Sequence, residues 1–321
     1  MLLRCFPRLH LGLMDMGNVT SRTYGGAGFA LSSPATEIIA ERSSGRTEIA
    51  GLEMLDADAQ AGLRACVNRW AQLNKSAHVH IKIHRLPIQH IGLGTKTSLL
   101  MGTLAAATLA AGKEISQSAI QTLSGRGGAS GVGVNTFFHG GFVADAGHPA
   151  RKDLSFAPSS RRISHAVPPI LSRVPIPERW QVYLFLPSGR RFSGNAEQEF
   201  FTKNTPIRRS EVLDSIALLY HGVVPAVLTA DLSLLKESLA NLHKVGFKKR
   251  ELAAQSEDVK AIIAYLDSIR DCAVGLSSMG PLIYAISERT ISAEVEDIKK
   301  TFNVDLLATC SGRNRGFEVQ R

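Results

Sequence analysis

The first third of the chain alternates between strand-like and helix-like patterns of hydrophobic residues. Residues 2–13 alternate loosely, and the glycine-rich segment 24–28 interrupts the pattern before Phe29. This arrangement predicts a hairpin whose turn, at the glycines, lets the backbone approach a ligand. Three further segments have the spacing of a strand, a helix and a strand, in this order: 34–40, 56–74 and 79–83.

Two glycine-rich loops come next, and each stands beside a predicted helix. The loop 86–98 opens onto the apolar run 99–111, which has the composition of a buried helix. A short helix at 116–122 leads into the second loop, 124–134, and a strand is expected at 142–145.

The second half of the chain mixes helices with strands. Segment 147–176, rich in Pro, Ser and Arg, predicts a connector between two domains, 1–165 and 166–321. A strand at 179–186 precedes a polar, basic loop at 189–206. The periodicity beyond that loop predicts helices at 210–220, 231–244, 256–271 and 294–302, strands at 282–286 and 305–309, and a third glycine- and serine-rich loop at 275–281. This order favours an α+β layer.

Composition excludes several classes of protein. Hydrophobic residues make up 44% of the 321 positions and charged residues 20%, which excludes a disordered chain, and no periodic composition indicates a fibrous one. The longest apolar run, 99–111, is shorter than the roughly 20 residues of a membrane helix. Residues 1–13 lack the cleavage site of a secretory signal, so we expect a cytoplasmic protein with no membrane partner.

Cysteine and histidine spacing gives no sign of a metal site. The four scattered cysteines include no CxxC pair, which is typical of structural thiols in a reducing compartment; they are Cys5, Cys66, Cys272 and Cys310. Three histidines alternate on one predicted strand without a carboxylate or cysteine beside them, and we interpret them as surface residues: His78, His80 and His84.

The net charge of +9 comes from 37 Lys and Arg against 28 Asp and Glu. Much of the excess lies between Arg151 and Arg209, where few aromatic residues accompany the basic ones. Stacking of single-stranded nucleic acid is therefore poorly supported, and we expect no nucleic-acid partner. The charge fits anionic metabolites or a solvated face.

The first loop has the chemistry of an anion site. Gly92 and Gly94 let backbone N–H groups converge, and the start of the following helix adds about half a positive charge. Lys96, Thr97 and Ser98 add an ammonium group and two hydroxyls. The loop matches neither a Walker A loop nor GxGxxG, and a plain glycine turn before a helix is the alternative.

The second loop surrounds a single arginine with glycines. Such a loop costs backbone entropy, which favours a functional role over a passive connection. Arg126 can donate two parallel hydrogen bonds to a phosphate or pyrophosphate, and Gly127, Gly128 and Ser130 are expected to bind beside it.

Several segments, spread over nearly the whole length, carry a family resemblance as a set although each loop alone is a weak signal. They are Pro7–Asp15, Gly25–Gly28, His90–Thr97, Gly125–Gly133, His139–Phe142, Ser277–Pro281 and Arg313–Gly316. In this order they resemble the GHMP kinase superfamily and, within it, the family of β-ribofuranosylaminobenzene 5′-phosphate synthases.

The resemblance implies a GHMP kinase-like, two-domain α+β fold. Its N-terminal α/β domain would be like one found in a ribosomal protein, its C-terminal α+β domain would be ferredoxin-like, and the ligand would lie between them. The implied activity is a decarboxylating C-glycoside synthesis of the tetrahydromethanopterin pathway. Phosphoribosyl pyrophosphate loses pyrophosphate, and 4-aminobenzoate or 4-hydroxybenzoate attacks C1 with loss of CO₂. Mg²⁺ is the implied cofactor, and since many relatives dimerise, a homodimer is a further expectation.

The resemblance also suggests site residues outside the first two loops. Candidates for ring contacts, metal coordination or proton removal are His10, Asp15 and His139, with structural hydrogen bonding as the alternative. Ser277 and Ser278 are expected to cap the third loop against the ligand. The C-terminal pair, Arg313 and Arg315, is expected either to bind a carboxylate or phosphate or to stay solvated. No metal ligands are identified.

One departure from the superfamily pattern bears on the activity. A GHMP kinase commonly follows the Ser-Gly of its second loop with an aliphatic residue and an aspartate that orients the accepting hydroxyl. Here Val132 is followed by Gly133. The synthase is therefore the leading hypothesis, and an ATP-dependent small-molecule kinase or a C-nucleoside synthase using a heteroaromatic acid are alternatives. A third class, a basic nucleic-acid-binding protein, would be indicated by salt-dependent RNA binding.

Overall fold

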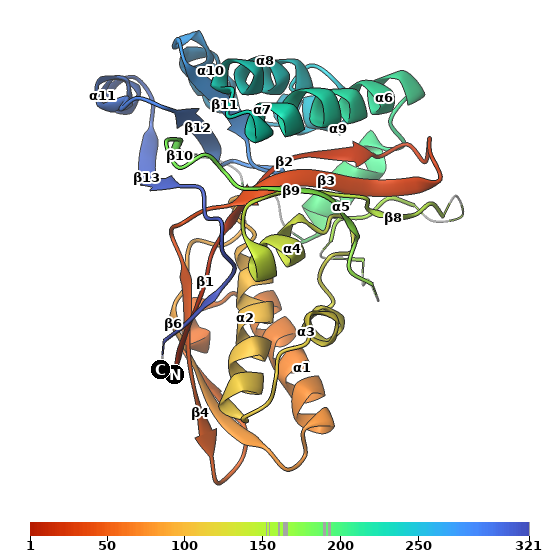
Figure 1. The fold of residues 1–321 in the computed structure, drawn as a ribbon, viewed down its shortest axis with the longest axis vertical. Coiled ribbons are helices and arrows are strands. Elements are labelled where there is room, and N and C mark those ends of the chain that lie inside the picture. Colours follow the sequence, from red (N-terminus) through yellow and green to blue (C-terminus); the bar gives the residue numbers. More distant parts are fainter. Residues whose placement is uncertain are drawn as a thin grey trace.

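The computed structural model describes residues 1–151, 153, 155–159, 161–162, 166–188, 191 and 194–320. Three sheets and their covering helices follow one another along the molecule (Figure 1). Helices α1 to α3 flank the first sheet at one end of the molecule. Helices α6 to α10 gather at the other end, with α6 and α9 against β2 and α10 against the third sheet. The two chain termini lie side by side because the first and last strands pair.

The first sheet has the strand order β14-β1-β4-β6-β5. Its strands are β1 (Leu2–Cys5), β4 (Thr36–Ser43), β5 (Glu48–Ala50), β6 (His78–Arg85) and β14 (Glu318–Gln320). Burial alternates along β4 and β6 because only one face of the sheet is covered. Three helices cover that face: α1 (Ala57–Leu73), α2 (Thr95–Ala110) and α3 (Gln117–Ser124).

Helix α2 runs through the middle of this layer, which explains its apolar composition. It packs against β4 on one side and against α1 and α3 on the others, and its residues from Leu99 to Ala107 are all buried. The close approach to β1 requires Gly102, since a Cβ there would lie 2.3 Å from the Sγ atom of Cys5. Helix α1 is preceded by η1 (Leu52–Met54) and begins after Asp56, whose side chain accepts a hydrogen bond from the Ala59 N–H at 2.8 Å.

The middle sheet has the order β2-β3-β7-β9, with β8 paired to β3. Its strands are β2 (Arg8–Asp15), β3 (Arg22–Ala30), β7 (Phe142–Asp145), β8 (His148–Pro149) and β9 (Ile170–Val174). The predicted hairpin of β2 and β3 is confirmed, but the prediction that its turn lies at residues 24–28 is wrong. The turn lies at residues 16–21, and the glycines are inside β3. Neighbouring atoms lie too close to the strand for a side chain there, since a Cβ on Gly28 would be 2.2 Å from the Leu9 carbonyl oxygen.

The third sheet has the order β11-β12-β10-β13. Its strands are β10 (Gln181–Pro187), β11 (Cys272–Leu276), β12 (Ile283–Ser287) and β13 (Val304–Ser311). One face packs against α10 (Glu257–Ser268) and α11 (Ser292–Thr301). The other face joins the apolar core that the middle sheet shares with α8 (Leu232–Leu242).

The remaining helices include three that the periodicity did not predict. Helix α4 (Val132–His139) follows the second loop directly, α5 (Gly194–Asn204) occupies the segment predicted as a polar loop, and α9 (Gly246–Ala253) follows α8 after a short turn. Each is short; α5 and α9 have few apolar residues, and α4 contains Gly133 and is flanked by Gly131 and Gly140, so the helical pattern of each is weak. The other predicted helices and strands are confirmed with small shifts at their ends.

One helical run is long and apolar enough to span a membrane by length and composition, at Arg209–Leu228. It comprises α6 (Arg209–Ala217), a π-helical segment η2 (Leu218–Val223) and α7 (Val224–Leu228). Leu219, Val223 and Val227 belong to the core between the middle and third sheets. Leu213 and Leu228 are exposed, so packing inside the protein accounts for only part of the apolar surface of this run.

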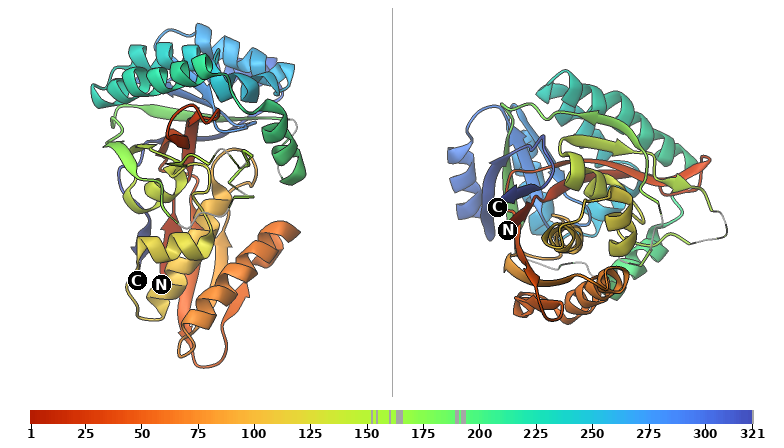
Figure 2. Two further views of the ribbon diagram at one scale, coloured as in Figure 1. Left: turned by 90° about the vertical axis from the view of Figure 1, so that its right-hand side faces the viewer. Right: turned by 60° about the horizontal axis from the view of Figure 1, so that its bottom comes forward.

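The architecture confirms the α+β fold class. The division at residues 165 and 166 stays a prediction, and strand pairing crosses it twice. Strand β9 continues the middle sheet beside β7, and β14 returns to the first sheet beside β1. The two parts of the chain are thereby joined through two shared sheets (Figure 2).

Candidate functional site

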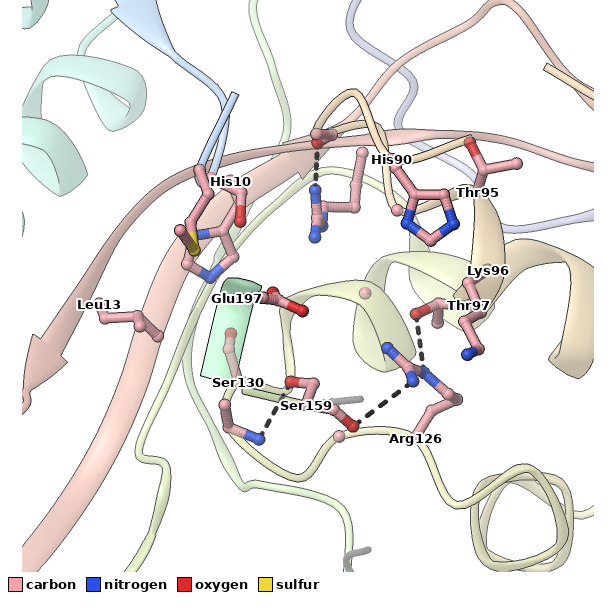
Figure 3. A pocket seen from close by; sticks show the side chains of 18 of the residues that line it. His10, Leu13, His90, Thr95, Lys96, Thr97, Arg126, Ser130, Ser159 and Glu197 are labelled. Atoms are coloured by element: carbon pink, nitrogen blue, oxygen red, sulfur yellow. Dashed lines mark hydrogen bonds between the residues drawn. The ribbon is translucent and has the colours of Figure 1, made fainter. Parts of the chain in front are cut away.

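A cavity of about 300 Å³ lies where the first two glycine-rich loops meet the middle sheet and the third loop. Its walls come from β2, the start of α2, the second loop, α5 and α9. Figure 3 shows Lys96, Thr97 and Arg126 on one side of the cavity, His10 and Leu13 on the other, and Glu197 between them. Segments more than 180 residues apart in the sequence therefore form one site.

The first loop holds a strained backbone against the third loop. Gly92 has a φ of 105°, and a Cβ there would lie 2.3 Å from the Ser277 carbonyl oxygen, so only glycine fits. Its own carbonyl accepts hydrogen bonds from Arg8 Nη1 at 2.5 Å and from the Ser277 hydroxyl at 2.8 Å. The loop is thus fixed by contacts from β2 and from the third loop.

Helix α2 begins at Thr95, four residues earlier than predicted, so Lys96, Thr97 and Ser98 form its first turn. The N–H groups at a helix start have no intrahelical partner and favour an anion. Thr95, Lys96 and Thr97 line the cavity, and the ammonium group of Lys96 is 2.8 Å from the exposed carboxylate of Asp58. Ser98 is buried instead, and its hydroxyl donates to the Phe6 carbonyl at 3.2 Å.

Arg126 forms the second cationic element of this side. Its Nε donates to the Thr97 hydroxyl at 3.1 Å, and Nη1 lies 3.5 Å from the Ser159 carbonyl. Burial lowers the pKa of its guanidinium, although the group remains charged at neutral pH. Gly127 lines the cavity, whereas Gly128 does not, because its Cα packs against the Arg162 carbonyl. We call Gly94, Lys96, Thr97 and Arg126 the basic side.

Ser130, at the floor of the cavity, is held by a buried carboxylate that sequence reasoning missed. Its hydroxyl donates to Asp145 at 2.9 Å, and the same carboxylate accepts from the N–H groups of Gly131 and Gly147 at 2.9 Å each. Burial raises the pKa of Asp145 to about 6 despite these donors. A carboxylate at the end of a strand, two residues before a glycine, is a signal that a sequence reading can use.

His10 faces the cavity close to Ser130. The Nε2 atom of His10 and the Oγ atom of Ser130 each lie 2.8 Å from the point where Gly26 would carry a Cβ, so this glycine makes room for both. Burial, together with the charges of Arg8 and Lys248, lowers the pKa of His10 well below its ordinary value. The imidazole is therefore neutral at physiological pH and able to accept a hydrogen bond, while the lowered pKa makes it a weak proton acceptor.

The third loop is docked on the backbone of His10. Ser277 is fully buried and its hydroxyl accepts from the His10 N–H at 3.1 Å, while the Ser278 N–H donates to the His10 carbonyl at 3.0 Å. Ser278 lines the cavity and Ser277 does not. Ser277 therefore joins the first and third loops, and only Ser278 can contact a ligand.

Opposite the basic side, the cavity wall is apolar. Leu13, Phe201 and Met279 line it, are buried, and belong to one cluster of packed side chains; we call these three residues the apolar side. Arg8, Glu197 and Glu251 add charge to the cavity wall. The sequence analysis predicted none of the six as a site residue, although Arg8, Leu13 and Met279 lie within the segments that carry the family resemblance.

Besides Ser98, Gly128 and Ser277, three further predicted site residues do not line the cavity, and the structure gives each a contact within the protein. Asp15 accepts hydrogen bonds from the N–H groups of Gly17, Val19 and Thr20 and closes the turn after β2. His139 lies 3.2 Å from Gln117 at the end of α4. Arg313 binds Glu318 at 2.7 Å and stacks over the Phe6 ring, while Arg315 is exposed.

In the part of the chain that the structure describes, no three side chains of His, Cys, Asp or Glu lie close enough together to hold a metal ion. His80 and His84 are exposed, as predicted, and His78 is half-buried. All four cysteines are buried free thiols. The cavity carboxylates of Asp58 and Glu251 are each paired with a lysine.

Three curated proteins that are similar to this chain carry the same name. The chain is 32% identical to a β-ribofuranosylphenol 5′-phosphate synthase of Archaeoglobus fulgidus, with 99% of each chain covered. Proteins with the same name from Methanocaldococcus jannaschii and Methanothermobacter thermautotrophicus are 32% and 28% identical, covering 92% and 96% of this chain and 92% and 95% of their own lengths. No protein-family model matches the chain.

Comparison with solved structures identifies the fold. A homoserine kinase of Cytophaga hutchinsonii superposes with a TM-score of 0.71 at 16% identity, covering 99% of this chain and 97% of its own. A phosphomevalonate kinase of Streptococcus pneumoniae gives 0.69 at 10% identity, covering 96% and 98%. The fold is that of the GHMP kinases, as predicted, and full-length identity above 30% shows that this chain belongs to the β-ribofuranosylphenol 5′-phosphate synthase family of enzymes.

Proposed function

We propose that the protein condenses phosphoribosyl pyrophosphate with 4-hydroxybenzoate or 4-aminobenzoate, releasing pyrophosphate and CO₂. The observation that carries this proposal is a single cavity with a basic side facing an apolar side. A phosphorylated sugar and an aromatic ring need these two environments within reach of each other. The name of the A. fulgidus relative supports the ribosyl and phenol parts of the product.

The reaction balances without an oxidant or a reductant. The bond between C1 of the ribose and the pyrophosphate oxygen breaks, and its electron pair leaves with pyrophosphate. The ring carbon that bears the carboxylate forms the new bond to C1. The bond to the carboxylate then breaks, CO₂ leaves, and the released electron pair restores the aromatic ring.

The basic side would stabilise the leaving pyrophosphate. Lys96 and Arg126 supply positive charge, and the first turn of α2 supplies backbone N–H donors. Arg8, half-buried on β2 and bonded to the Gly92 carbonyl, also lines the cavity, and burial lowers the pKa of its guanidinium to about 10, so it too is charged at neutral pH. These donors are fixed by the protein before substrate arrives, which is the arrangement that lowers the barrier of an ionic bond cleavage.

His10 and Ser130 would act on the opposite side of the ribose. The neutral imidazole can accept a hydrogen bond, and the Ser130 hydroxyl is oriented by Asp145. Phe201, Leu13 and Met279 would hold the aromatic ring and exclude water from the cation-like C1 carbon. Because water competes with the ring carbon for C1, this exclusion favours C–C bond formation.

Mg²⁺ is proposed as a partner of the substrate. Such ions commonly bind through one or two carboxylates and through substrate phosphates. Glu197 lines the cavity between its two sides and is the carboxylate we propose to face the ion. Bound Mg²⁺ would neutralise charge on the pyrophosphate as it leaves.

The kinase alternative fits the site less well. Gly133 occupies the position of the expected aspartate, and a Cβ there would lie 3.3 Å from the methyl group of Thr97. A carboxylate at this position would crowd the start of α2. The fold is shared with kinases, but the side chain that orients an accepting hydroxyl is absent from this position.

The direct test uses Mg²⁺, phosphoribosyl pyrophosphate and carboxyl-labelled 4-hydroxybenzoate or 4-aminobenzoate. Equimolar release of labelled CO₂ and pyrophosphate is the expected result. No release with either acid from folded protein would contradict the proposal and would favour heteroaromatic acids, and then ATP-dependent phosphorylation, as the next tests. The cytoplasmic location of the protein and its assembly as a homodimer stay predictions.

A further inference from the structure

A buried ion pair lies behind the third loop and has no part in the phosphate chemistry described above. Lys248 and Glu251, both on α9, are 2% and 4% exposed in their side chains, and Nζ lies 2.5 Å from Oε2. Taking two charges out of water is costly, so a pair at this depth calls for an explanation.

The ammonium group of Lys248 makes all its hydrogen bonds within the protein. Besides Glu251, its ammonium group donates to the carbonyls of Leu276 at 3.0 Å and Ser278 at 3.3 Å. These contacts use all three of its N–H donors. Lys248 therefore fixes the third loop and one oxygen of Glu251, and it has no donor left for a substrate.

One carboxylate oxygen of Glu251 is available to a ligand. It lines the cavity, and among the described residues its Oε1 atom receives no hydrogen bond, because the contact with Lys248 uses Oε2. Its partner Lys248 binds Ser278, and Ser278 binds the backbone of His10, so Glu251 belongs to the part of the wall that lies with His10. Figure 3 shows His10 across the cavity from Lys96 and Arg126.

We infer that Oε1 of Glu251 accepts a hydrogen bond from the hydroxyl or amino group at ring position 4 of the aromatic acid. This inference rests on the proposed function. The acid has a carboxylate at one end and a hydrogen-bond donor at the other, and the cavity has Lys96 and Arg126 on one side and the Glu251 carboxylate in the part of the wall that lies with His10. Only one orientation avoids placing two carboxylates together.

This orientation also brings the correct ring carbon to the sugar. The carbon that bears the carboxylate points toward the basic side, where C1 of the ribose would be exposed as pyrophosphate leaves. The substituent at position 4 points away from it toward Glu251. A hydrogen bond that draws the proton from this substituent increases electron density at the opposite ring carbon, which is the carbon that attacks.

The test compares acids with and without a donor at position 4. Dissociation constants for 4-hydroxybenzoate and for unsubstituted benzoate are measured by calorimetry with Mg²⁺ and pyrophosphate present, in the wild type and in Glu251→Gln. We expect the wild type to prefer 4-hydroxybenzoate at least about tenfold and the variant to lose most of that preference. An unchanged preference in the variant would overturn the inference.

A second variant guards against misfolding, since Glu251→Gln leaves Lys248 without its counter-ion. The double change Lys248→Met/Glu251→Leu replaces the pair with apolar side chains and leaves no acceptor at this place, so it should show the same loss of preference. Pyrophosphate affinity within about twofold of wild type would show that the basic side is intact. If the wild type binds neither acid, the proposed function itself fails, which is distinguishable from an unchanged preference in the variants.

Discussion

The two sides of the cavity are built in different ways. The basic side comes from a stretch of about 35 consecutive residues, 92–127, in which two glycine-containing loops flank α2 and α3. The apolar side takes Leu13 from β2, Phe201 from α5 and Met279 from the third loop. One side is local in the sequence, and the other is assembled from three distant segments.

This difference follows from the chemistry of the two ligands. An anion is bound by backbone N–H groups at a helix start, and these groups are consecutive in the chain. A ring is bound by the surfaces of side chains, which can come from any element that reaches the site. We therefore expect substitutions on the basic side and on the apolar side to affect the two substrates separately.

Arg126→Ala should have the largest effect, and only on the phosphorylated substrate. Loss of a charged, partly buried donor is expected to weaken binding of phosphoribosyl pyrophosphate about 100-fold, with the affinity for the aromatic acid nearly unchanged. Calorimetry measures both. Arg179→Ala is the matched control, because this arginine pairs with Glu288 on the outer surface. Unchanged binding in Arg126→Ala would remove the second loop from the site.

Asp15→Ala should affect the scaffold rather than either substrate. Three backbone N–H groups lose their acceptor, so the free energy of unfolding should fall by about 2–4 kcal/mol. Urea denaturation measures this change, with the exposed Asp153→Ala as control. A loss of kcat without a loss of stability would instead return Asp15 to the list of catalytic residues.

Asp145→Asn tests the residue that lies beneath Ser130, between the two sides. Because the pKa of Asp145 is raised to about 6 from 3.8, its protonated form favours folding at low pH. That contribution is lost as the pH rises through 6, and it amounts to about 1–3 kcal/mol. The wild type should therefore lose more stability than the variant between pH 4 and pH 7. Parallel pH profiles in urea denaturation would mean that Asp145 is already ionised at pH 4.

Phe201→Ala should have a smaller effect, limited to the aromatic acid. Removing one ring from the apolar side is expected to raise KM for the acid about tenfold, while the affinity for phosphoribosyl pyrophosphate stays within about twofold. Phe302→Ala, beyond the third sheet, controls for general destabilisation. Equal changes for both substrates would show that the two sides are not separate.

Most of the fold was predictable from local patterns. Periodicity located α1, α2 and α10 because each has a continuous apolar face or interior. It failed at α5, where Phe200 and Phe201 stand among charged residues, and at α4, where glycines obscure the helix. The turn of the first hairpin was misplaced because Gly26 and Gly28 make room for neighbouring groups within a strand.

The family, the fold class and the basic side could be predicted from the sequence. Consecutive residues carry the signals for the elements and for the basic side, and the order of seven segments along the chain carries the family resemblance. Which candidate residues meet in the cavity depends on tertiary packing. It brought His10 and Ser278 to the cavity, directed Asp15 and His139 to other partners, and added Arg8 and Glu251. These placements depend on strand pairing and loop docking between segments far apart in the chain, and no local spacing encodes such distances.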